Sequence, residues 1–209
     1  GPNEYANSLV ALRGRTGEVV WHYQIVHHDL WNYDVASQPL LTELTLHGKS
    51  VPAVVQNTKQ GLVFVFHRET GAPLFPVEER PVPAGDVPGE WYSPTQPYPT
   101  RFPPLVPQRF SADRSWGFTF WDRRRCRKLA ESFRTGDIYT PPSLEGTVTV
   151  PWSGGGANWG GAALEPSRRL MVINTSRVAE VVKIVRIDDV RKAPSGAANA
   201  LDLTKPTRM

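Results

Sequence analysis

Residues 51–71 read Val-Pro-Ala-Val-Val-Gln-Asn-Thr-Lys-Gln-Gly-Leu-Val-Phe-Val-Phe-His-Arg-Glu-Thr-Gly. Two short runs, Val51–Gln56 and Leu62–His67, are rich in β-branched and aromatic residues, and a polar turn at 59–61 separates them. This pattern predicts two antiparallel strands. The stretch then turns again and ends in Thr70-Gly71, the same pair that closes an earlier turn at Thr16-Gly17. Short strands joined by tight turns are typical of a β-meander.

Similar runs occur on both sides of this stretch. A hairpin is expected from Leu9–Leu12 and Glu18–Val26, whereas a helical pattern is found only around Arg123–Ser132. Many short strands in repeated units predict an all-β fold, a β-propeller of four-stranded blades rather than a sandwich. Further strands are expected at Pro39–Leu44, Gly146–Pro151, Ala162–Pro166, Arg169–Asn174 and Val181–Ile187.

The segment Pro73–Pro107 holds many of the 20 prolines. Proline fixes φ and cannot donate to a strand ladder, so an excursion without a sheet is expected here. Aromatic residues such as Trp91 and Tyr98 indicate that this excursion is ordered, because disordered segments are poor in aromatic side chains.

Composition excludes several classes of protein. The formal net charge of +4 is modest for 209 residues, and the one dense basic run, Arg123–Lys128, is not part of a recognisable nucleic-acid-binding motif, so no nucleic-acid partner is expected. The single cysteine, Cys126, excludes an internal disulfide and a cysteine metal cluster. No apolar run approaches the length of a membrane span.

The densest group of chemical side chains is His27-His28-Asp29-Leu30-Trp31-Asn32-Tyr33-Asp34. Such a cluster is either a hydrogen-bonded corner or a site, and the residues alone leave both open. Adjacent histidines on an extended segment point to opposite faces, which disfavours a shared zinc ion. On the same extended backbone, His28, Asn32 and Asp34 would lie on one face.

Three further features carry two interpretations each. The glycine loop Gly154–Gly161 lacks a dinucleotide or phosphate-loop pattern, so it is either a plain turn or a tight turn that brings Asn158 and Trp159 against a flat partner. Lys59 is either an exposed turn lysine or a functional cation. Asn174 ends an apolar strand.

Several segments resemble the quinoprotein dehydrogenases, in particular the membrane-bound glucose dehydrogenase branch. Residues 5–21 resemble a tryptophan-docking repeat of that family. The other matching motifs are His27–Trp31 with Gln38-Pro39, Pro52–Gly61, Thr70–Pro83, Ser93–Pro97, Tyr139–Ser143 and Asn158–Gly161.

The resemblance implies an eight-bladed propeller that holds pyrroloquinoline quinone (PQQ) and a divalent cation, calcium or magnesium. Such enzymes oxidise an aldose to its lactone and pass electrons to ubiquinone at the periplasmic face of the bacterial inner membrane. The resemblance further implies that Lys59, Asn158, Trp159 and Asn174 contact the cofactor.

Asn32 departs from the family pattern, which has aspartate at this position as general base and cation ligand. An asparagine cannot accept the substrate proton, although its carbonyl could still bind a hard cation weakly. Asp29 or Asp34 could substitute as the base. Loss of the base also leaves an alternative open, a non-catalytic propeller that binds without turnover.

A complete propeller of this family is far longer than 209 residues. The chain is therefore expected to be a fragment, with about three blades over residues 1–190 and a polar tail over 191–209. Membrane association would then come from a segment outside it.

Overall fold

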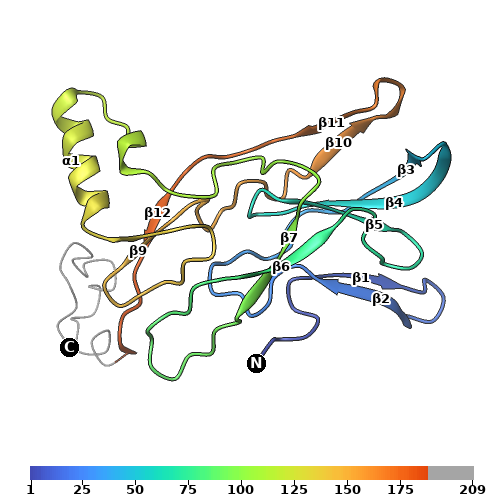
Figure 1. The fold of residues 1–209 in the computed structure, drawn as a ribbon, viewed down its shortest axis with the longest axis horizontal. Helices are drawn as coiled ribbons and strands as arrows, with labels where there is room; N and C mark the ends of the chain where they lie inside the picture. The colour runs from blue at the N-terminus through green and yellow to red at the C-terminus, as the bar shows by residue number, and fades with distance from the viewer. Residues whose placement is uncertain (188–209) are drawn as a thin grey trace.

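The computed structural model describes residues 1–187, which form short strands and one α-helix (Figure 1). The elements in chain order are β1 (Ser8–Leu12), β2 (Val19–Gln24), β3 (Leu40–Leu46), β4 (Lys49–Asn57), β5 (Val63–His67), β6 (Val77–Pro81), β7 (Thr95–Pro99), the 3-10 turn η1 (Ala112–Arg114), α1 (Phe120–Glu131), β8 (Arg134–Thr135), β9 (Thr147–Thr149), β10 (Ala162–Glu165), the 3-10 turn η2 (Pro166–Arg168), β11 (Leu170–Ile173) and β12 (Glu180–Val182).

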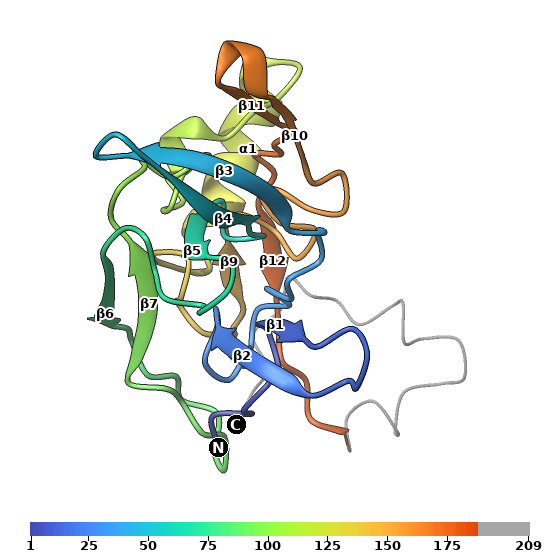
Figure 2. The same cartoon turned by 90° about the vertical axis from the view of Figure 1, so that its right-hand side faces the viewer.

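The strands assemble into separate sheets of two or three strands each. Their orders are β1-β2, β3-β4-β5, β6-β7, β12-β9-β8 and β10-β11. Figures 1 and 2 agree that the β1-β2 hairpin lies below β3-β4-β5 and that β10-β11 lies above it. The predicted all-β propeller class is confirmed, although within residues 1–187 no sheet reaches four strands and the sheets do not close into a ring. The β8-β9 pair is parallel, unlike the predicted antiparallel pattern.

The sheet β3-β4-β5 is the centre of the fold because it is covered on both faces. Alternate residues of a strand point to opposite faces. Accordingly, Val54, Phe64 and Phe66 join one buried cluster with Trp31 and Tyr139. The other face carries a second cluster that contains Ala53, Val55, Val63 and Val65.

A tryptophan joins the first two sheets. Trp21 on β2 donates its indole N–H to the carbonyl oxygen of Arg68 at 3.0 Å. Gly71 has a φ of +71°, and a β-carbon added there would lie 2.6 Å from the Trp21 ring. The Trp21 ring therefore packs directly on the Thr70-Gly71 turn.

The prediction that residues 73–107 form no sheet is wrong, because β6 and β7 pair antiparallel there. Prolines 81, 97 and 99 lie in these strands. Pro97 and Pro99 are two residues apart and so share one edge of β7. In a two-stranded sheet each strand has a free edge, where a missing N–H removes no ladder hydrogen bond. The segment is ordered, as expected, since Tyr98 packs edge-on against the buried Tyr139.

The helix α1 begins earlier than predicted because Thr119 and Asp122 form a reciprocal capping box. The last strand is shorter than predicted, since β12 ends at Val182. Within residues 1–187, no helix is both long enough and apolar enough to cross a bilayer. The expected tail at 191–209 lies outside the described residues, and the count of about three blades stays a prediction.

Candidate functional site

Lys59 lies in the turn that leads from β4 to β5. Thr58 closes this turn, since its N–H and its hydroxyl both donate to the carbonyl oxygen of Leu62, at 3.1 and 3.0 Å. The Lys59 side chain is only 5% exposed. The structure therefore excludes an exposed turn lysine.

The buried ammonium has two partners from the segment 27–34. Lys59 Nζ donates to the main-chain oxygen of Asn32 at 3.0 Å and forms an ion pair with the Asp34 carboxylate. A buried ammonium is costly without such partners. The Asp34 side chain is 47% exposed, so the carboxylate links the buried cation to the surface.

The glycine loop covers Lys59 from the other side. Gly156 donates its N–H to the carbonyl oxygen of Lys59 at 2.6 Å. Gly155 has a φ of +77°, and a β-carbon there would lie 2.5 Å from Lys59 Cγ. Only a residue without a side chain permits this approach. Of the two interpretations of the loop, the structure favours the tight turn that brings backbone against a neighbour.

Two buried aromatic side chains fix the backbone around Asn32. Trp31 donates its indole N–H to Thr140 O at 2.9 Å, and the Tyr33 hydroxyl donates to Pro151 O at 3.2 Å. Burial, reinforced by nearby carboxylates, raises the pKa of Tyr33 far above its usual range, so the phenol remains a neutral donor. Asn32 itself is exposed between these anchors.

The segment is not extended, so the expected common face of His28, Asn32 and Asp34 is wrong. His28 and Asn32 have φ values of +48° and +63°, in the left-handed region. His28 is instead paired with Glu90, and His27 with Glu79. The Asn32 amide reaches the start of the glycine loop, where Nδ2 lies 3.4 Å from Ser153 O.

Asp29 is engaged away from Lys59. Its two carboxylate oxygens accept from Asn7 Nδ2 at 2.8 Å and from the Trp31 N–H at 2.9 Å. Asp29 therefore has the contacts of a structural residue that fixes the local backbone. Asp34, the other carboxylate expected as a possible substitute base, is the one that the fold brings to Lys59.

Asn158, Trp159 and Asn174 gather at the far end of the glycine loop. Asn158 holds the loop, since its amide donates to Gly154 O at 2.6 Å and accepts from the Trp159 N–H at 2.9 Å. The Trp159 side chain is 80% exposed. Asn174 lies beside Gly160, where a β-carbon would be 3.6 Å from Asn174 Nδ2. The loop connects this group to Lys59 through Gly155 and Gly156.

Sequence reasoning missed a set of buried polar atoms around the Lys59 turn. Gln60 is fully buried, and its Oε1 has no partner. Gln108 donates to Gln60 O at 2.9 Å, but its own Oε1 is also unpartnered. Buried polar atoms normally bind water or a ligand. The run of polar residues 56–60, directly after an apolar strand, was the signal that could have revealed them.

The described residues do not gather a metal site. No group of three His, Cys, Asp or Glu side chains among residues 1–187 could hold an ion. Asn32 and Asp34 offer oxygen atoms near Lys59, but Ca²⁺ takes six to eight oxygen ligands. The side chains of residues 1–187 alone therefore do not fit calcium or magnesium.

The chain is similar in sequence to known proteins. Residues 1–207 match the family described as PQQ: glucose/ethanol/alcohol dehydrogenase, β-propeller domain. The chain is 35% identical over 205 residues to the quinoprotein glucose dehydrogenase of Escherichia coli (strain K12), with 98% of this chain and 24% of that protein aligned.

Two further similarities bear on substrate and fold. The chain is 37% identical to the quinate/shikimate dehydrogenase (quinone) of Acinetobacter baylyi (strain ATCC 33305 / BD413 / ADP1), with 88% of this chain and 23% of that protein covered. A solved structure of a quinohemoprotein alcohol dehydrogenase from Pseudomonas putida HK5 superimposes with a TM-score of 0.54 at 23% identity, covering 88% of this chain and 22% of that one. The chain thus spans about a quarter of the length of the relatives that it matches.

Proposed function

Because the chain belongs to the family of PQQ-dependent glucose/ethanol/alcohol dehydrogenase β-propellers, we propose that it forms part of a dehydrogenase in which Lys59 contacts PQQ. The observation that carries the proposal is the buried Lys59 ammonium, held by Asn32 O and the Asp34 carboxylate. The length of the relatives indicates a parent protein with further propeller blades.

The residues around Lys59 fit a flat, anionic, polar cofactor. An ammonium has three donors, and two are used within the chain, which leaves one for a ligand. The exposed ring of Trp159 adds a stacking surface. We assign Asn158 and Asn174 to the same surface. When bound, PQQ supplies the two-electron redox chemistry.

The proposed roles of the chain's residues are electrostatic and positional. The Lys59 ammonium, which is buried against the glycine loop, stabilises negative charge on a bound anion. Asp34 is the proposed proton acceptor, because it is the partly exposed carboxylate next to Lys59, whereas Asn32 has no titratable group and both oxygens of Asp29 are engaged. A cation near Asn32 would need ligands from outside the described residues.

The proposed substrate is an aldose of the glucose type, oxidised at its anomeric carbon to a lactone, with electrons passed to a quinone such as ubiquinone. A relative named for glucose supports this choice, and a relative named for quinate and shikimate makes a cyclic polyol the second candidate. The proposed location is the periplasmic face of the inner membrane.

Asn32 favours one alternative function. Without the family aspartate, the parent protein could be a propeller that binds PQQ or another ligand without turnover. The two functions differ in whether a sugar reduces a dye through the bound cofactor.

The test is a PQQ titration of the parent protein with calcium, followed by dye reduction with glucose and with quinate. Lys59→Met should weaken PQQ binding at least a hundredfold, because it removes a buried cation. Lys49→Met, at an exposed hairpin position, is the matched control and should bind as the wild type does. Binding without turnover would favour the alternative, and equal binding by both variants would refute the role of Lys59.

A further inference from the structure

The segment that leads into α1 exposes an unusual amount of aromatic surface. Among residues 1–187, five large apolar side chains are exposed by two thirds or more. One of them is Trp159 in the candidate site. The other four lie together at the start of α1: Trp116 (67%), Phe118 (89%), Phe120 (70%) and Trp121 (77%). We name these four residues the aromatic tip.

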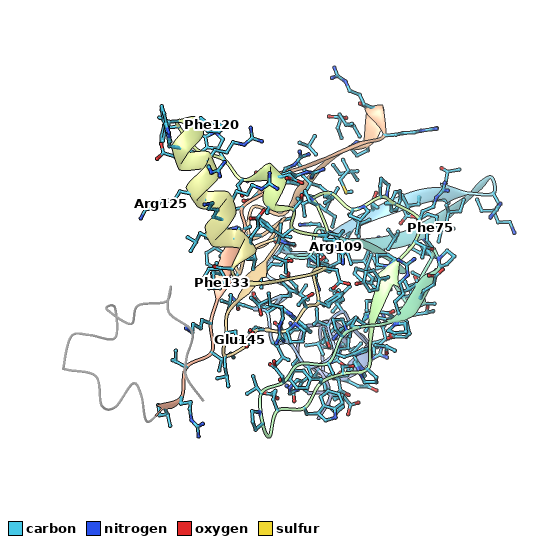
Figure 3. The ribbon with its side chains drawn as sticks, turned by 60° about the vertical axis from the view of Figure 1, so that its left-hand side comes forward. Phe75, Arg109, Phe120, Arg125, Phe133 and Glu145 are labelled. Carbon is cyan, nitrogen blue, oxygen red and sulfur yellow. The ribbon has the colours of Figure 1, made fainter. Side chains whose placement is uncertain are left out.

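The aromatic tip is not part of a core. The helix α1 has no buried residue, and its start is fixed by the Thr119–Asp122 capping box. Figure 1 shows α1 at one end of the molecule, beyond the sheets. In Figure 3, Phe120 lies at the outer end of the helix and Phe133 lies at the end nearest the sheets. The start of α1 therefore lies at the end of the helix that is away from the sheets.

Positive charge is concentrated behind the aromatic tip. Residues 112–134 contain seven Arg or Lys and three Asp or Glu, a net of four positive charges, which equals the net charge of the whole chain. Arg127 is paired with Asp113 and Glu131. Arg124, Arg125 and Lys128 form no ion pair within residues 1–187 and are exposed.

The positions of the cations on α1 favour a lipid bilayer over a protein as the binding partner. Successive helical residues are rotated by about 100°, so Arg123, Arg124 and Arg125 point to three sides of α1. A protein partner that covered this helix would have to bury several of these guanidinium groups, and each buried charge would need its own acidic partner. A bilayer surface accepts aromatic rings at the headgroup level and cations beside lipid phosphates at the same time.

A surface pocket beside α1 supports a lipid bilayer as the partner. It has a volume of about 430 Å³ and is lined by Phe120, by the cations Arg123, Arg124, Arg127 and Lys128, and by the carboxylates Asp113 and Glu131. Both carboxylates pair with Arg127, which leaves three cations without an acidic partner in the pocket. A ring next to three such cations is suited to an anionic phospholipid headgroup with its adjoining acyl chain. We propose that the aromatic tip and the basic surface of α1 dock onto an anionic lipid bilayer. This proposal is independent of the dehydrogenase activity.

Cys126 makes the test direct, because it is free, exposed and the only cysteine of the chain. A fluorophore on Cys126 of the parent protein, with any other cysteine replaced by serine, reports the approach of α1 to vesicles that carry nitroxide lipids. We expect quenching with phosphatidylglycerol-containing vesicles and much less with pure phosphatidylcholine. Because the reporter lies on α1, another membrane anchor in the parent would not by itself quench it.

Variants of the aromatic tip and of the basic surface, each with a control elsewhere on the molecule, test which residues contact the bilayer. The double variant Phe118→Ser/Trp121→Ser and the charge variant Arg124→Glu/Arg125→Glu should each lower the quenching at least tenfold at a given lipid concentration. Leu41→Ser, at an apolar residue of β3 that is 64% exposed, and Arg15→Glu, on the first hairpin, should leave it unchanged. A fluorophore that is shielded from water but not quenched by lipid would show that protein covers the tip. A water-exposed, unquenched fluorophore would show that the tip is free, and either result overturns the proposal.

Discussion

Position 32 combines a backbone requirement with a chemical one. The φ of +63° lies in the left-handed region, which asparagine and aspartate tolerate better than most residues. Asparagine therefore satisfies the backbone but supplies no base. Since aspartate has nearly the same shape, restoring a carboxylate here should not disturb the fold.

The first prediction compares the three carboxylate positions of this segment by kcat for dye reduction in the parent protein. Asp34→Asn should lower kcat about a hundredfold or more, because it removes the proposed proton acceptor. Asn32→Asp should raise kcat about tenfold or more by adding a second acceptor. Asp29→Asn should have little effect, since an amide still accepts the Trp31 N–H. Full activity in Asp34→Asn would rule out Asp34, and no gain in Asn32→Asp would show that Asn32 does not limit turnover.

Sequence reasoning identified Lys59, Asn32 and Asn158 through motifs, but it could not show which carboxylate meets Lys59. The expectation of an extended backbone failed at His28 and Asn32, whose positive φ values turn the chain between them. Asp34 reaches Lys59 only because Trp31 and Tyr33 anchor the intervening backbone to residues more than 100 positions away. A single sequence contains no signal for such distant contacts.

Among the elements, the turn at Lys59 and the glycine loop depend on each other. The second prediction concerns Gly155→Ala, which combines backbone strain with a contact of 2.5 Å to Lys59 Cγ. The matched control is Gly17→Ala, where φ is +74° and no atom lies within 4 Å of the added carbon. The control should cost about 1–2 kcal/mol, whereas Gly155→Ala should cost about 1–3 kcal/mol more by overpacking.

Both effects are measurable in the parent protein by hydrogen exchange of the two loops and by PQQ titration. Gly155→Ala should also weaken PQQ binding about tenfold or more, because Lys59 must move. Gly17→Ala should bind PQQ normally. Equal exchange and equal binding in the two variants would show that the loop can shift away from Lys59 without cost.

The third prediction concerns the loop between β6 and β7, where Glu90 meets His28. Glu90 Oε1 lies 2.9 Å from His28 Nε2 and accepts the Trp91 N–H at 2.8 Å. These hydrogen bonds, the one to His28 foremost, hold the pKa of Glu90 below its usual value of 4.5. A depressed carboxylate pKa stabilises the folded loop above the unfolded pKa, and this stabilisation is lost as pH falls through the folded value.

Glu90→Gln should therefore loosen residues 85–93 at pH 7 by about 0.2–1 kcal/mol, which is the usual range for an exposed pair. The difference from wild type should be fully present above pH 4.5 and should shrink as the pH falls below that value. Hydrogen exchange at matched intrinsic rates measures it, and the exposed Glu69→Gln serves as control. A difference that does not shrink in acid would mean that the Glu90 side chain acts by shape rather than by charge.

The elements differ in how far their sequence determines them. The β-branched and aromatic residues of Val51–Gln56 and Leu62–His67 predicted the central strands, and both faces of that sheet are buried. The β6-β7 hairpin escaped prediction since its prolines are tolerated only at free edges, and edges are a property of the assembled sheet. The helix was predicted from its interior, but its first turn depends on the Thr119–Asp122 capping box.

Over the whole molecule, the sheets are joined by side chains that bond to distant main-chain groups. Trp21 joins β2 to the turn after β5, and Trp31 joins the segment 27–34 to Thr140. Gln96 makes the most complete link of this kind. Its Oε1 accepts the His27 N–H at 2.8 Å, and its Nε2 donates to the His27 carbonyl oxygen at 2.6 Å. One fully buried amide thus replaces a strand neighbour for His27.

The fourth prediction follows from this link. Gln96→Ala leaves both main-chain groups of His27 without a partner, and each buried orphan costs about 1–3 kcal/mol. The segment that carries Asn32 and Asp34 should therefore open more often, so that the His27 amide exchanges with solvent at least thirtyfold faster in the parent protein. Gln38→Ala, which removes an exposed glutamine from the same part of the chain, should leave that exchange unchanged. Because the Lys59 partners follow His27 directly, Gln96→Ala should also weaken PQQ binding although Gln96 has no contact with Lys59. Unchanged exchange would show that water replaces the amide, and the site would then be held by Trp31 and Tyr33 alone.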